Sequence, residues 1–147
     1  MSSKGWKTGG AVFMALVISA CGSDPVDAGN DELTVQDLYG TWEWISSEGG
    51  IAGTIRTPVT EGFGQQVVLR DPREIELFID GQSVGATTFT FFPPDPGDGE
   101  PRGRFEMAES LQGFQPQFVG FDIEGTLMLT DPCCDRFVHR FGSVVGF

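Results

Sequence analysis

Apolar and polar residues alternate with a period of two over most of the chain after residue 40. In residues 74–80, for example, Ile75, Leu77 and Ile79 fall on one face. This alternation is typical of a strand that buries one face. We find no window of 11 or more residues with an apolar repeat of 3.6 residues, so the pattern favours strands over helices.

The alternation and its turn residues predict eight short strands. They span residues 41–47, 65–70, 74–80, 85–92, 104–108, 117–123, 126–130 and 136–141. Pairs such as Asp80-Gly81 and Glu124-Gly125 separate them, and most connections are too short for a crossover helix. Eight antiparallel strands can close into a small barrel without free edges, whereas a two-sheet sandwich usually needs longer connections. We therefore expect an all-β fold, an eight-stranded antiparallel up-and-down barrel.

The first strand and the stretch after it are the most distinctive part of this pattern. Trp42, Trp44 and Ser46 share one face of residues 41–47, and Glu43 and Ile45 share the other. The Gly-rich stretch SSEGGIAGTIRTPVTEGFG follows. It is too long for a hairpin turn, so we expect a loop there.

The N-terminal segment has the layout of a signal peptide. Lys4 and Lys7 precede ten small or apolar residues, 11–20, and this run is half the length of about 20 residues that a spanning helix needs. Ile18-Ser19-Ala20-Cys21 resembles the lipobox of bacterial lipoproteins. That resemblance implies cleavage before Cys21 and attachment of acyl chains to its thiol. The alternative is an ordinary secretory signal with an incidental Cys near the cut.

The lipobox divides the chain into three parts. Residues 1–20 are the expected helical signal peptide, residues 21–32 a lipidated Cys followed by a disordered tether, and residues 33–147 the barrel domain. Gly22-Ser23 lacks the Asp that retains lipoproteins at the inner membrane of Gram-negative bacteria. By that resemblance, the expected location is the cell envelope, with the acyl chains in the outer membrane.

Charge narrows the range of partners. The chain has a formal net charge of −12, and both lysines lie in the signal segment. Residues 21–147 therefore carry seven Arg against 21 Asp and Glu, a charge of −14. Such a surface is a poor partner for nucleic acid, so we expect none.

Several motifs resemble those of lipocalins. Gly40-Thr41-Trp42 is similar to the Gly-any-Trp signature of the first lipocalin strand, and Arg140 stands where these barrels carry a basic residue across that Trp. The segments GTW, GGIAGTIRTP, LMLTD and CCDRFVHRF also resemble, in order, those of bacterial lipocalin-like domains. The resemblance covers nearly all of residues 36–142. It implies that Trp42 and Arg140 form a structural pair that closes the barrel, and that the loop IAGTIRTPVTEGFG covers its open end.

Within such a barrel, interior aromatic residues and the loop Arg are the candidate ligand-binding residues. They are Trp44, Arg56, Phe89, Phe91 and Phe121. The aromatic residues are expected to fill the core if the interior is solid. Arg56 would bind a carboxylate at the mouth, unless it is simply an exposed loop residue.

The sequence offers little for catalysis. His139 is the one His, and with Cys133 and Cys134 it lacks the spacing of a metal site, so we expect no metal and no cofactor. The adjacent Cys133 and Cys134 could form a strained disulfide or stay as thiols. We find no nucleophile elbow and no phosphate-binding loop, and with one His a Ser-His-Asp site could assemble only by accident. We therefore expect no enzyme.

Two functions are favoured over a third, a redox or hydrolytic enzyme, which would need a reactive thiol at Cys133 or Cys134. The first is a lipid-anchored, lipocalin-like barrel that binds a small apolar or amphipathic ligand. The second is a solid-cored interaction or inhibitor module whose loops, especially residues 93–103, contact another envelope protein. A cavity of at least about 300 Å³ would favour the first function, and a packed interior the second.

Overall fold

The strands form an antiparallel sheet with two very short helices beside it. The computed structural model describes residues 32–97, 101–132 and 136–144. Within these residues the elements are α1 (Val35–Leu38), β1 (Gly40–Gly49), β2 (Thr54–Arg56), α2 (Pro58–Glu61), β3 (Gln65–Arg70), β4 (Glu74–Ile79), β5 (Gln82–Phe92), β6 (Gly103–Met107), β7 (Phe118–Phe121), β8 (Leu127–Thr130) and β9 (Phe137–Ser143). Neither helix in this part of the chain is long and apolar enough to cross a membrane.

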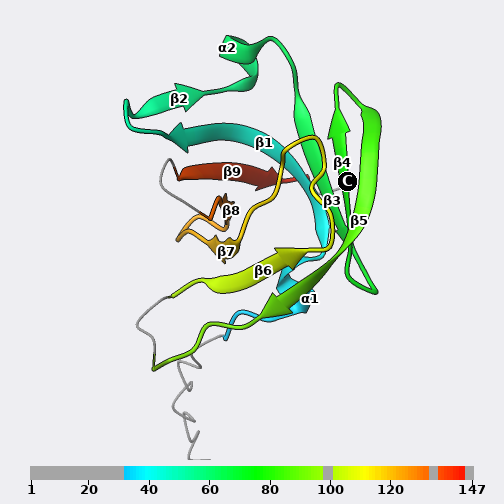
Figure 1. Ribbon diagram of the computed structural model, residues 1–147, viewed down its shortest axis with the longest axis vertical. Helices are drawn as coiled ribbons and strands as arrows, with labels where there is room; N and C mark the ends of the chain where they lie inside the picture. Colours follow the sequence, from blue (N-terminus) through cyan, green and yellow to red (C-terminus); the bar gives the residue numbers. More distant parts are fainter. Residues whose placement is uncertain (1–31, 98–100, 133–135, 145–147) are drawn as a thin grey trace, which may run out of the picture. The chain divides into compact units, whose positions relative to one another are not determined.

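The sheet closes on itself (Figure 1). Strands β1 and β3 to β9 pair in order, and β9 returns to pair with β1 from Trp42↔Ser143 to Gly49↔Phe137. All pairings are antiparallel, and β2 adds only to the last residues of β1. The predicted all-β fold with an eight-stranded antiparallel barrel is therefore confirmed. All eight predicted strands are present; β3 has the predicted bounds, and the other seven differ from prediction by one to three residues at one or both ends.

The turns follow from local chemistry. Asp80 and Gly81 join β4 to β5 with φ angles of 49° and 76°, the left-handed conformation that a two-residue hairpin turn requires. Asp122 organises the β7–β8 turn because one of its carboxylate oxygens accepts the N–H groups of Thr126 and Glu124, each at 2.9 Å. These hydrogen bonds hold the pKa of Asp122 below its usual range, and the bond from Thr126 has the largest effect.

A β-bulge in β1 corrects the predicted face of Ser46. Trp44 lies opposite Phe141 but Ser46 lies opposite Arg140, so β1 has one extra residue here. The extra residue reverses the alternation, and Ser47 rather than Ser46 continues the inward face of Trp42 and Trp44. Alternation alone could not reveal the bulge, because it depends on pairing with a strand about 90 residues later.

The predicted loop after the first strand is ordered, and in part a hairpin. β1 runs on to Gly49, turns through Gly50 and Gly53 with positive φ angles, and pairs with β2. Residues 50–62 turn back after β1, so that β2 runs alongside the end of β1 and α2 follows it (Figure 1). We call them the β2–α2 arm. The expectation of an irregular loop was therefore wrong for this segment.

The barrel interior is packed with apolar side chains. Sixteen buried residues form one cluster: Leu38, Trp42, Trp44, Val67, Leu69, Ile75, Leu77, Phe89, Phe91, Phe105, Met107, Leu111, Val119, Leu127, Leu129 and Phe141. At one end α1 covers the core, where the Trp42 Nε1–H donates to the Leu38 carbonyl at 2.9 Å. Residues 31–147 form a compact unit that contains every strand and this whole core, so we expect them to fold without the preceding segment.

Candidate functional site

A small pocket lies at the other end of the barrel, where β1, β4 and β8 end. Its volume is about 230 Å³. Apolar, aromatic and polar side chains line it: Phe63, Gln65, Leu77, Ile79, Gln112, Gly113, Phe114, Asp131 and His139. Because the packed core lies directly below, this mouth pocket is a shallow site and not a deep interior cavity.

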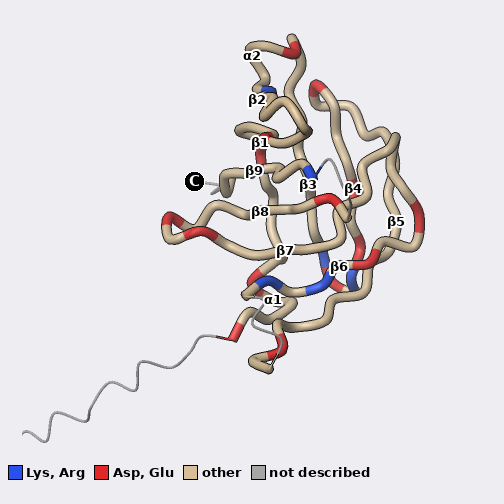
Figure 2. Tube along the Cα trace, turned by 60° about the vertical axis from the view of Figure 1, so that its left-hand side comes forward, with Lys and Arg blue, Asp and Glu red and all other residues tan. Residues whose placement is uncertain are grey.

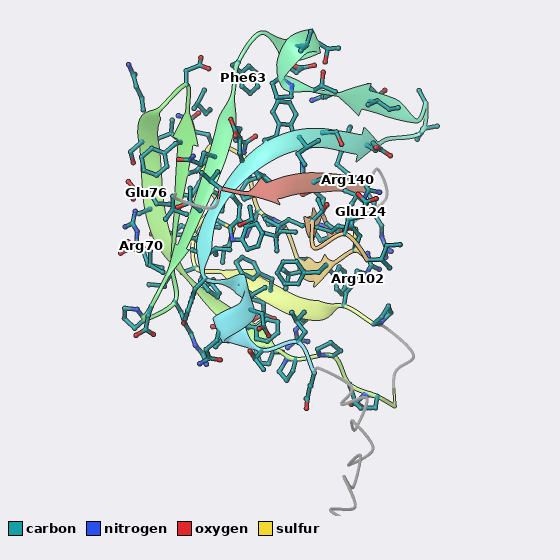
Figure 3. The ribbon with its side chains drawn as sticks, turned by 180° about the vertical axis from the view of Figure 1, so that it is seen from behind. Phe63, Arg70, Glu76, Arg102, Glu124 and Arg140 are labelled. Carbon is teal, nitrogen blue, oxygen red and sulfur yellow. The ribbon has the colours of Figure 1, made fainter. Side chains whose placement is uncertain are left out.

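Phe63 partly closes the mouth pocket. It lies on the segment that joins α2 to β3 (Figure 3), and its ring stacks on Trp44 with centroids 5.7 Å apart and planes 19° apart. The next residue, Gly64, is tied to the β4–β5 turn, because its N–H donates to Asp80 Oδ1 at 2.7 Å. The end of the Gly-rich segment thus lies over the open end of the barrel, with Phe63 against the core.

A chain of hydrogen bonds crosses the wall of the pocket. The Trp44 Nε1–H donates to Ser47 Oγ at 2.9 Å, Ser47 Oγ lies 2.7 Å from His139 Nδ1, and His139 Nε2 lies 3.2 Å from Asp131 Oδ1. An indole N–H can only donate and a carboxylate can only accept. All three hydrogen bonds can therefore form together when the Ser47 hydroxyl donates to Nδ1 and a neutral His139 donates from Nε2.

This series of hydrogen bonds brings together Ser, His and Asp, the three residue types of a serine hydrolase. Nothing in the sequence indicated that they would meet. In that arrangement the hydroxyl is a nucleophile, the imidazole its base, and the carboxylate orients the ring. Ser47, however, is 5 % exposed, accepts a bond from Trp44, and is not among the residues that line the pocket. The arrangement is therefore suited to holding the His139 ring in one orientation in the pocket wall.

The structure corrects the predicted Trp42–Arg140 pair. Trp42 faces the interior, where its ring lies 5.5 Å from that of Phe121. Arg140 lies on the outer face, opposite Ser46, and its guanidinium approaches Glu48 at 3.7 Å and Asp122 at 3.6 Å. The bulge in β1 and the sheet alternation place the two side chains on opposite faces, so Phe121 and α1 close this end instead.

The other predicted binding residues do not converge on one site. Phe89 and Phe91 are buried in the core, and Phe89 stacks on Phe105 with centroids 4.6 Å apart. Phe121 lies at the α1 end, and Arg56 lies on β2 with its guanidinium 5.0 Å from the Phe137 ring. Trp44 does not line the mouth pocket itself, but its ring stacks on that of Phe63, which does.

Some predicted residues lie outside the described part of the chain. They are the lipobox residues Ile18, Ser19 and Ala20, the lipidation site Cys21, and Cys133 and Cys134. Among the residues that are described, no group of three or more His, Cys, Asp or Glu could hold a metal ion.

Sequence reasoning missed the residues that make up the mouth pocket. Ser47 and His139 are 92 residues apart in sequence, and only the β1–β9 pairing makes them neighbours. Asp131 comes directly after β8, and its N–H bonds to the Phe137 carbonyl at the start of β9. Its position beside His139 could have been inferred from an antiparallel β8–β9 hairpin, because Leu129 lies opposite His139.

A second hollow lies on the outside of the barrel and is larger, about 820 Å³. It is lined by Phe92, Pro93, Pro94, Asp95, Pro96, Arg102, Arg104 and Phe118. Arg104 lies over the ring of Phe92 at 4.3 Å, and Arg102 over that of Phe118 at 5.2 Å. This groove is part of the predicted 93–103 contact surface.

Comparisons of the chain with protein-family models, curated proteins and solved structures found no match. The relationship that the structure supports is therefore one of architecture. The described residues form a closed, eight-stranded antiparallel barrel, which is consistent with a lipocalin-like fold.

Proposed function

We propose that this protein is a lipid-anchored envelope protein whose barrel binds a small molecule at its open end. The observation that carries the proposal is the mouth pocket, a concave site of about 230 Å³ with aromatic walls and a few converging polar groups. That combination is typical of small-molecule sites, although most are larger, about 300–1,000 Å³. The ligand is therefore a small molecule, or one end of an amphipathic molecule, and it does not enter the packed interior.

Binding is a better proposal than catalysis for this site. The Ser47 hydroxyl accepts from Trp44 and lies 2.7 Å from His139 Nδ1, and the side chain is buried and does not line the pocket. A nucleophile must reach the reacting carbon at a distance of about 3 Å. We therefore retain the expectation that the protein is not an enzyme and assign the chain of hydrogen bonds to positioning His139.

Lipidation of Cys21 is the first part of the proposal to test. The protein extracted from the membrane fraction of a Gram-negative host is expected to lack residues 1–20 and to carry extra mass equal to a diacylglyceryl group, with or without a further acyl chain. Two or three chains are needed because one chain gives only reversible binding. Intact mass spectrometry checks this, and a Cys21→Ala variant should lose the acyl mass. An uncleaved chain with an unmodified Cys21 would contradict the anchor.

Occupancy of the mouth pocket tests the binding part. Native mass spectrometry of the full protein from the same membranes is expected to show extra mass that is lost on denaturation. Ile79→Trp should abolish this mass, because Ile79 lines the pocket and a larger ring would fill it. Phe78→Trp is the matched control, since Phe78 neighbours Ile79 on β4 and faces outward. If both variants carried the same bound mass as the parent, the ligand would bind elsewhere. If neither the parent nor the variants carried any bound mass, the proposed binding function would be contradicted.

The outer groove favours the rival function, an interaction module. It joins a Pro-rich segment to two arginines that lie over aromatic rings, a composition typical of protein interfaces. The packed core also agrees with this alternative. If the occupancy experiment shows no bound molecule, the groove is the surface to test for an envelope protein partner.

A further inference from the structure

We propose that the mouth pocket selects small organic cations, in particular a primary ammonium group carried on a compact apolar body. This inference rests on the proposed binding function and adds the chemical class of the ligand. It differs from the carboxylate ligand that Arg56 suggested. Three observations carry it: the charge of the pocket, the geometry of Asp131, and the aromatic rings that line the same pocket.

The fixed charge of the pocket lining is negative. Asp131 is the one carboxylate among its lining residues, and no Lys or Arg lines it. Ser47 Oγ lies 2.7 Å from His139 Nδ1 and Asp131 Oδ1 lies 3.2 Å from His139 Nε2, and a neutral ring that accepts at Nδ1 and donates from Nε2 satisfies both contacts. The whole chain has a formal net charge of −12, and acidic positions are spread over the turns and strands of the barrel (Figure 2). Such a field attracts cations to the site and repels anions.

Asp131 has an oxygen available for a ligand. Oδ1 interacts with His139 Nε2 at 3.2 Å, whereas Oδ2 has no hydrogen-bond partner among the residues that the structure describes. The side chain is 32 % exposed and belongs to the pocket wall. A carboxylate can accept several hydrogen bonds, and an ammonium group has three donors. Gln65 and Gln112 also line the pocket, and their side chains carry amide oxygens, a further type of acceptor for an ammonium group.

Two phenylalanine rings line the same pocket as this carboxylate. Phe114 lies against His139, with ring centroids 5.6 Å apart and planes 58° apart, and Phe63 lines the same pocket while stacking on Trp44. The faces of such rings carry partial negative charge and attract cations, and they also contact apolar groups. The pocket thus offers a charge partner and an apolar wall within about 230 Å³, which suits a small amine better than a neutral or acidic molecule.

Three probes of matched shape and different charge test this inference: benzylamine, benzyl alcohol and benzoate. They are titrated at neutral pH into ¹⁵N-labelled residues 31–147, which contain Trp42 and Trp44 but not Trp6. The Trp44 indole N–H lies beside the mouth and reports binding. The Trp42 indole N–H lies at the α1 end and is an internal control. We expect benzylamine to shift Trp44 with a Kd at least tenfold lower than that of benzyl alcohol, and benzoate to cause no shift.

Two variants that each remove one negative charge distinguish the effect of the pocket carboxylate from that of the protein's overall negative charge. Asp131→Asn should remove the tenfold preference for benzylamine, whereas Glu106→Gln, which removes an exposed carboxylate on β6, should leave it unchanged. Equal affinity for all three probes, or a preference for benzoate, would overturn the cation inference but leave the binding site standing. If no probe shifts Trp44, both the inference and the proposed function fail. The comparison of the three probes uses the parent protein, so it tests the inference even if Asp131→Asn fails to fold.

Discussion

The Phe105→Ala substitution is expected to lower the free energy of unfolding by about 3–5 kcal/mol, the usual effect of removing a buried aromatic ring. Phe105 is 0 % exposed in the middle of β6 and stacks on Phe89 with centroids 4.6 Å apart. Its loss would leave a cavity that the closed sheet cannot collapse to fill. Since domains of this size are typically stable by 5–15 kcal/mol, a large fraction of the total stability would be lost.

Urea unfolding of residues 31–147 measures this effect, and Phe92→Ala is the matched control. Phe92 lies opposite Arg104 at the β5–β6 pairing, is 38 % exposed, and has the Arg104 guanidinium 4.3 Å above its ring. An exposed cation–π contact contributes about 0.5–1 kcal/mol, so Phe92→Ala should cost at most about 1 kcal/mol. If the two variants lost equal stability, the packed barrel interior would be wrong.

The Gly49→Ala substitution is expected to open the seam between β1 and β9 where the barrel closes. A Cβ at this position would overlap the carbonyl oxygen of Arg136 and lie 2.7 Å from the Cα of Phe137. Both obstacles are backbone atoms, so no side-chain rotation can relieve them. Overpacking of this kind costs about 1–3 kcal/mol, and here it also loosens the pairing that closes the sheet.

Hydrogen exchange locates the damage from Gly49→Ala. Amides of β1 and β9 should exchange faster, while those of β4 and β5 should change less, because neither of these two strands pairs with β1 or β9. Gly64→Ala is the control, since the nearest atom to its added Cβ is Asp80 Oδ1 at an ordinary 3.8 Å. Its stability should stay within about 0.5 kcal/mol of the parent. Unchanged exchange at the β1–β9 seam would contradict the closed barrel.

The fold was far more predictable from the sequence than the candidate site. Local alternation of apolar and polar residues predicts each strand, and turn residues such as Asp80-Gly81 mark the strand ends. The site depends on which side chain faces inward at the end of β1. Because of the bulge after Trp44, the inward-facing residue is Ser47 and not Ser46, and Arg140 lies on the outer face. A resemblance between motifs could not supply the register of this strand pair.

The sequence by itself determined the order and antiparallel pairing of the barrel strands, because alternation and short turns act over a few neighbouring residues. The tertiary structure alone decided that the interior is packed, and that Ser47, His139 and Asp131 meet at a small pocket beside Phe63. These features depend on contacts between strands up to 92 residues apart. Side chains separated in this way become neighbours only when the sheet closes, and a single bulge changes which of them meet.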